Sequence, residues 1–259
     1  MKRTLIAASI LLTAGVAQAN DCNIDLDGSL TFEKGVLTVS SPGSAKMTIT
    51  PDYTLLIDGQ AYSTNADQQR AVEDYYNSMS KALPMTADIA VEGVQLATTA
   101  LNEVFGELIG YNDDAVLELN EALSRIGEDV NNSFYAEDGS LHIRSSDFDN
   151  GVFEDHWEAE LEQAIEKAVF SSMGKLLIAV GTEMLFSGGD GNAFEARMEN
   201  FAEDLEQRIE NQADGLEFKA EQLCDVLHIA DIAEADLNRE FSELSDLNLL
   251  EVTRDSHRM

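Results

Sequence analysis

The stretch Lys46–Tyr76, KMTITPDYTLLIDGQAYSTNADQQRAVEDYY, changes from the two-residue period of strands to the longer period of helices. In its first half apolar and polar residues alternate, and the Asp58-Gly59 pair favours a tight hairpin turn. Asn65 then supplies a residue type that caps helices, and Gln68 stands where a capping-box partner is needed. The stretch therefore predicts a β-meander that ends at residue 64 and a helix that begins directly after Asn65.

Upstream of this junction, residues 20–64 predict short antiparallel strands between turn residues. A small sheet of this kind is marginal alone, so we expect it to pack on helices. Downstream, residues 65–252 predict a helical body with a short β element near 138–144, and residues 253–259 predict a frayed tail. The sequence thus indicates an α+β fold, with a small N-terminal antiparallel β-meander packed on a mainly α-helical body.

Apolar residues recur at helical spacing through most of this body. Pro84 is expected to end the first helix, because proline lacks an amide hydrogen and clashes with the preceding turn. The strand around Leu141 and Ile143 could join the N-terminal sheet or form a hairpin of its own. The predicted core stripes contain Val72, Tyr75, Met79 and Leu83; Val116, Leu119, Leu123, Ile126 and Val130; Phe153, Trp157, Leu161, Ile165 and Ala168; and Leu223, Leu227, Ala230, Leu237, Phe241 and Leu244.

The first 19 residues have the pattern of a cleavable secretory signal. Two basic residues precede an apolar run, and Ala17 and Ala19 form a small-x-small cleavage site. The segment Leu176–Phe186 is too short and too polar for a bilayer span, and predicts a buried or an interfacial helix. The sequence therefore predicts a water-soluble protein in the periplasm of a Gram-negative host, without a membrane span.

Two cysteines in an exported chain predict one disulfide, between Cys22 and Cys224. Two free thiols or an intermolecular bond are the alternatives. If the bond forms, it brings the N-terminal strand region onto the last helix, because bonded cysteines have Cα atoms about 4.4–6.8 Å apart.

Charge is the most unusual property of this chain of 259 residues. It has 16 basic and 49 acidic residues, for a formal net charge of −33. Such a surface repels polyanions, so nucleic acid is not expected as a partner.

The sequence has no motif for a catalytic, cofactor or metal site. The four histidines, His142, His156, His228 and His257, lack zinc-site spacing, and no serine-hydrolase elbow or phosphate-binding glycine loop occurs. Two acidic loops could attract calcium, although neither has the EF-hand pattern. They contain Asp25 and Asp27, and Asp147, Asp149, Asn150 and Glu154.

Several segments resemble the YggN family of exported Gram-negative proteins, a domain of unknown function. They are Ile49 to Asp52, Leu56 to Gly59, Asn65 to Arg70, Asp74-Tyr75 and Leu83-Pro84, together with the N-terminal signal and the two cysteines. The resemblance implies a periplasmic location and supplies no functional residues.

Three functions fit these observations. The first is a non-enzymatic binding protein of the cell envelope, with an unidentified envelope protein as its partner. The second is an envelope hydrolase with an unrecognised site, which would gather His142 or His156 with a carboxylate and a hydroxyl in a pocket. The third is weak binding of divalent cations through the acidic loops.

Overall fold

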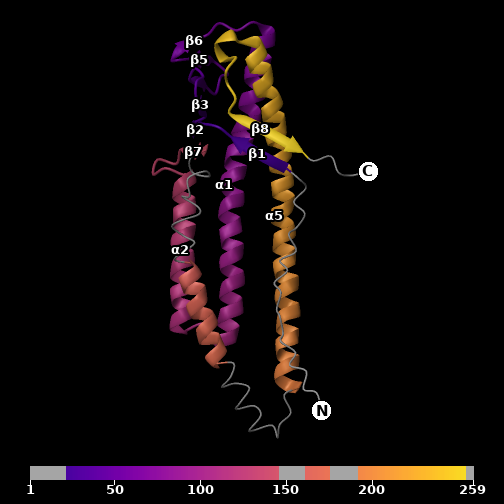
Figure 1. Ribbon diagram of the computed structural model, residues 1–259. Helices are drawn as coiled ribbons and strands as arrows, with labels where there is room; N and C mark the ends of the chain where they lie inside the picture. Colours follow the sequence, from indigo (N-terminus) through magenta and orange to yellow (C-terminus); the bar gives the residue numbers. More distant parts are fainter. Residues whose placement is uncertain (1–21, 146–160, 176–191, 255–259) are drawn as a thin grey trace, which may run out of the picture.

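The structure is a computed structural model that describes residues 22–145, 161–175 and 192–254, with side chains of the last segment from residue 199 onward. Two long helices, α1 (Ala66–Ile109) and α5 (Asn192–Glu240), run side by side in opposite directions (Figure 1). Helix α2 (Asp114–Phe134) turns back along α1, and a further helix covers residues 161–175. The strands and the short 3-10 helix are β1 (Cys22–Leu26), β2 (Ser29–Glu33), β3 (Val36–Ser40), β4 (Met47–Ile49), β5 (Leu55–Ile57), β6 (Gln60–Ala61), β7 (Leu141–Arg144), η1 (Ser242–Leu244) and β8 (Leu250–Arg254).

The predicted start of α1 is confirmed. The Asn65 side chain accepts hydrogen bonds from the backbone amides of Asp67 and Gln68, at 2.9 and 3.0 Å. In return, the Gln68 side chain accepts a bond from the Asn65 amide at 3.0 Å. This reciprocal pair satisfies three backbone amides at the helix start that have no carbonyl partner within the helix.

The prediction that Pro84 ends a helix is wrong, because α1 continues through it to Ile109. An interior proline costs about 3 kcal/mol. On both sides of it, Met79, Leu83 and Ala87 are buried in the core. Burial of a large apolar side chain stabilises a fold by about 1.5–3 kcal/mol. The continuous apolar stripe therefore outweighs the local cost.

Six strands form an antiparallel sheet in the order β6-β5-β4-β3-β2-β7. Alternate residues of its central strands are fully buried: Leu37 and Val39, Met47 and Ile49, and Leu55. They belong to the same core cluster as the upper half of α1 and the C-terminal part of α5. Of the two alternatives for residues 138–144, the first is confirmed, because β7 pairs with β2.

The C-terminal residues differ from the sequence prediction. Leu250–Arg254 is a strand rather than the end of a helix and a frayed tail, and it pairs with β1 in a separate two-stranded sheet. Leu250 and Val252 are buried, which anchors one face of β8 in the core. Periodicity within one segment could not predict this, because the partner strand lies more than 200 residues earlier in the chain.

The Cys22–Cys224 disulfide is present and joins β1 to α5, with 6.3 Å between the Cα atoms. A second buried cluster packs α2 against the lower half of α1 and the 161–175 helix. All five residues of the predicted α2 stripe are buried. The α+β prediction is confirmed, with the sheet on one side of a long helical body (Figure 1).

Candidate functional site

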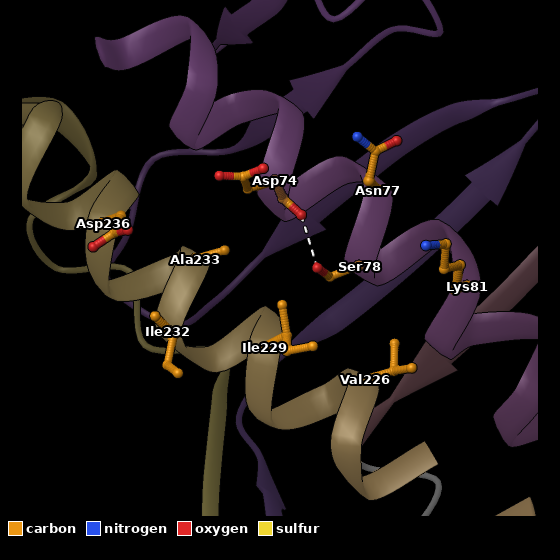
Figure 2. A pocket seen from close by; sticks show the side chains of 9 residues that line it. All are labelled: Asp74, Asn77, Ser78, Lys81, Val226, Ile229, Ile232, Ala233 and Asp236. Carbon is orange, nitrogen blue, oxygen red and sulfur yellow. Dashed lines mark hydrogen bonds between the residues drawn. The ribbon is translucent and has the colours of Figure 1, made fainter. Parts of the chain in front are cut away.

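A groove lies between α1 and α5 and is lined by both polar and apolar side chains. It encloses about 420 Å³. Figure 2 shows its two walls, one from each helix. The α1 wall consists of Asp74, Asn77, Ser78 and Lys81, and the α5 wall of Val226, Ile229, Ile232, Ala233 and Asp236.

The groove forms because small residues line its floor while large ones stand at its rim. Ser78 and Ala233 are buried and small, so they fill little of the space between the helices. The Ser78 hydroxyl donates to the Asp74 carbonyl at 2.8 Å, which satisfies it within its own helix. Ile229 and Ile232, in contrast, are 54% and 52% exposed. Burial of this apolar surface by a partner would be favourable.

The charges around the groove are unequally distributed. Asp74 and Asp236 lie at one end, on opposite walls, and Lys81 lies toward the other end beside Val226 (Figure 2). Asp236 also forms an ion pair with Arg239 in the next turn of α5. The arrangement suits a partner that presents apolar side chains next to a basic group.

A second depression of about 350 Å³ continues along the same face. Each of its α1 residues, such as Glu92 and Gln95, lies 18 positions after an α1 residue of the groove. Eighteen residues make five full helical turns, or about 27 Å, so both sets lie on the same face of α1. Lys219 of α5 donates to both oxygens of Glu92, one of them at 2.6 Å, and ties the helices together there. The two depressions thus lie on the same side of the α1–α5 pair, at different heights along it.

Sequence reasoning did not identify Ile229 and Ile232. The predicted core stripe of α5 contains Leu223, Leu227 and Ala230, all of which are buried. The two isoleucines lie three residues apart on the neighbouring face, where a helix exposed to water is expected to carry polar residues. That departure from the polar pattern is the signal that could have found them.

Glu234 carries a buried carboxyl group, which no pattern in the sequence indicated. Only 2% of the residue is exposed. Burial raises the pKa of Glu234, and hydrogen bonds from the amides of Leu249 and Leu250 and from the Tyr75 hydroxyl act in the opposite direction. Tyr75 is buried as well, and its burial, together with the nearby Glu234 charge, raises the pKa of Tyr75 well above its ordinary value. The carboxylate accepts from the two amides that lead into β8, so it fixes this segment of the chain.

His142 does lie near a hydroxyl and a carboxylate. Ser140 Oγ lies 2.6 Å from Asp138 Oδ1 and 2.8 Å from His142 Nε2. The hydrogen bond from Ser140 helps to lower the pKa of Asp138, so this carboxylate is an acceptor and takes the single hydroxyl proton. His142 Nε2 must then donate to Ser140, whereas a general base must accept the proton of its nucleophile. The three residues stabilise the turn before β7 rather than form a nucleophile–base pair.

The other predicted site residues are placed as follows. Cys22 and Cys224 are bonded. Asp25 and Asp27 are exposed, one within β1 and one after it. The cleavage-site residues Ala17 and Ala19, His156, His257 and the loop from Asp147 to Glu154 lie outside the described residues.

Two features are absent from the described part of the chain. There, no group of three or more histidine, cysteine or acidic side chains is arranged to hold a metal ion. No described helix combines the length and apolarity that a bilayer crossing requires. Calcium binding and hydrolase activity stay predictions.

Comparison with known proteins gives one family and uncharacterised relatives. The family model "Protein of unknown function (DUF2884)" matches residues 22–250. The uncharacterized protein YggN of Escherichia coli strain K12 is 23% identical over 192 residues, which cover 73% of this chain and 77% of that protein. YggN of Escherichia coli O157:H7 matches with the same values. No solved structure matches the chain significantly.

Proposed function

This chain belongs to the DUF2884 family of unknown function, as its resemblance to YggN predicted, and we propose that it is a non-enzymatic binding protein of the cell envelope. Its partner is another envelope protein that presents an apolar segment beside basic residues. The observation that carries the proposal is the pair of half-exposed isoleucines, Ile229 and Ile232, in a groove with carboxylates at one end.

Two features support a periplasmic location. The N-terminal 19 residues have the pattern of a cleavable signal, and the Cys22–Cys224 bond is of the type that persists in oxidising compartments. Intact mass of the protein from a periplasmic fraction tests both features. We expect a chain that begins at Asn20 and gains two alkylated thiols only after reduction.

The electrostatics support a basic partner. The chain carries a formal charge of −33, so a positively charged protein is attracted over a distance of about 10 Å at moderate ionic strength. Long-range attraction raises the association rate, and burial of the isoleucines then supplies short-range affinity. Binding should therefore weaken with salt but persist at physiological ionic strength.

Site-specific photo-crosslinking in the native host tests the proposal. A photoreactive residue replaces Ile229 or Ile232 in turn, and replaces Ala235 as the control. Ala235 is exposed on the same helix but does not line the groove. We expect the two groove positions to crosslink to one and the same protein, and the control position to give no such product.

Two variants make the result specific to the groove. Ile229→Glu replaces an apolar side chain of the groove by a charged one and should abolish the crosslink from position 232, because an unpaired charge opposes burial by the partner. The control variant Ala235→Glu adds the same charge outside the groove and should leave that crosslink unchanged. Equal crosslinking from positions 232 and 235, or no crosslinked protein at either groove position, would refute the proposal.

A further inference from the structure

The two outer edges of the β1–β8 sheet differ in whether other groups cover their backbone amides. On the β8 side, the amides of Leu250 and Val252 point away from β1 and donate to carboxylates of α5, Glu234 Oε1 at 3.3 Å and Asp231 Oδ2 at 3.4 Å. Those side chains close that edge of the sheet. An edge that is covered in this way cannot pair with another strand.

The β1 side has no such cover among the described residues. Asp27 donates its amide to the Leu249 carbonyl at 2.8 Å, which fixes the odd-numbered residues of β1 as those that bond to β8. The amide and carbonyl groups of Ile24 and Leu26 therefore point outward. In the described part of the chain β1 has β8 as its sole strand partner. An unpaired edge is a template for an added strand.

An apolar pocket of about 300 Å³ lies directly under this open edge. Residues of β1 form one rim, while α1, α5 and the two sheets supply the walls. Ile24 is 42% exposed at the rim, although it lies on the inward face of β1. The lining consists of Ile24, Asp25, Leu26, Leu30, Met79, Ala82, Leu83, Thr86, Ile143, Ser145, Leu223, Leu227 and Leu250.

The opposite face of the same sheet is acidic. Asp25 and Glu251 are directly opposite each other across β1 and β8, and both are exposed. Asp27, two residues along the same face of β1, is exposed as well. Like charges in facing positions destabilise a sheet, so cationic side chains beside them would be stabilising. A strand added to β1 thus meets apolar surface on one face and carboxylates on the other.

We propose that the open edge of β1 binds an extended peptide segment in which apolar and basic residues alternate. The segment adds to the sheet as a third strand through the backbone groups of Ile24 and Leu26. Its apolar side chains lie over the pocket, and its basic side chains lie on the face of Asp25 and Glu251. Backbone bonds supply affinity, and the pocket supplies selectivity for an apolar side chain.

This site shares no lining residue with the α1–α5 groove. Failure of one proposal therefore leaves the other intact. The groove variants described above serve as negative controls, because Ile229→Glu should not alter binding at β1.

The test uses the oxidised full-length mature protein and a synthetic peptide of seven residues, Lys-Val-Lys-Leu-Lys-Val-Lys, at physiological salt. Two N-methylated versions of this peptide are isomers of each other. One carries methyl groups on the backbone nitrogens of the three apolar residues, and the other carries them on the backbone nitrogens of the lysines at positions three, five and seven. All three peptides have the same side chains and charge. Fluorescence anisotropy measures their dissociation constants, and the amide exchange rates of Ile24 and Leu26 report the site.

In an antiparallel addition, the apolar residues face Ile24 and Leu26 in hydrogen-bonded pairs, so their amides point to β1. We expect the isomer methylated on those residues to bind roughly tenfold more weakly or worse, since it loses backbone bonds. The lysine-methylated isomer should bind like the parent peptide. A parallel addition would reverse the two results, and either selective loss supports the added strand.

Two variants locate the site. Thr86→Leu fills the pocket and should weaken the parent peptide by about tenfold, because its apolar side chain is displaced. Thr98→Leu is the matched control, since both threonines are partly buried on α1 and donate to the carbonyl four residues earlier. Equal affinity of the two methylated isomers, no binding up to about 1 mM, unchanged exchange at Ile24 and Leu26, or equal binding to both threonine variants would each overturn the proposal.

Discussion

Loss of the Cys22–Cys224 disulfide should lower the free energy of unfolding by up to about 5 kcal/mol. The bond joins residues separated by 202 positions. In the loop-entropy treatment, a closed loop of that length removes about 18 cal/mol/K from the unfolded chain, or about 5 kcal/mol at 25 °C. The perturbation is the double variant Cys22→Ala/Cys224→Ala, because Cys224 is buried and alanine leaves no polar group there.

Urea denaturation followed by far-ultraviolet circular dichroism measures the effect. With a slope of roughly 2–3 kcal/mol per molar urea, a loss of 5 kcal/mol moves the midpoint down by about 2 M. Reductant should shift the wild-type midpoint by the same amount. It should leave the double variant unchanged, which shows that reductant acts through this bond alone.

A different result is expected if the bond secures β1 locally. Within the described residues, β1 pairs with β8 and with no other strand. It could therefore detach in the reduced protein while the helices and the larger sheet stay folded. In that case the midpoint would move by less than about 0.5 M. Hydrogen exchange would increase at the amides that join β1 to β8, which are those of Asn23, Asp25, Asp27, Glu251 and Thr253, and would stay unchanged in the helices. That pattern would refute the loop-entropy reasoning.

Three other changes should alter stability in predictable directions. Because burial raises the pKa of Glu234 above its usual 4.5, the folded state holds this proton more tightly, so wild-type stability should fall as pH rises through the raised pKa. Glu234→Gln should remove that slope in urea titrations at a series of pH values, and an unchanged slope would exclude Glu234 as its source. Pro84→Ala should raise the melting temperature through a gain of about 1–3 kcal/mol, because it restores an amide in the middle of α1, and a lower melting temperature would contradict this. Asn65→Ala should cost about 1 kcal/mol in chemical denaturation, since two helix-start amides lose their acceptor, and a loss below about 0.3 kcal/mol would show that the cap is unimportant.

Local patterns predicted the elements whose causes are local. The cap at Asn65 depends on residues within one helical turn, and both hydrogen bonds of the capping box are present. The alternation in β4 and the stripe of α2 depend on which face is buried, so their buried residues could be read from spacing alone. The order of the meander strands follows from hairpin turns that join neighbours in sequence.

Features that depend on distant partners could not be predicted in this way. The continuation of α1 through Pro84 depends on core contacts that offset a local cost. Strand β8 forms because it pairs with β1 on one edge and donates to two carboxylates of α5 on the other. The groove depends on the register between α1 and α5, which sets Ile229 opposite Ser78 rather than opposite a bulky residue. Periodicity gives the buried face of each helix but not the register of two helices.

The pairing of Cys22 with Arg254 in the β1–β8 register has a topological consequence. These two residues are cross-strand neighbours, at a spacing of about 4.5–5.5 Å, so a linker of a few residues could join them. The chain could then be circularly permuted and opened at the exposed Asp138-Gly139 turn. Such a permutant would begin with β7 and carry β8 and β1 as one continuous hairpin. The same pairing means that an affinity tag fused after Arg254 would begin beside β1. Such a tag would hinder any molecule that binds to β1.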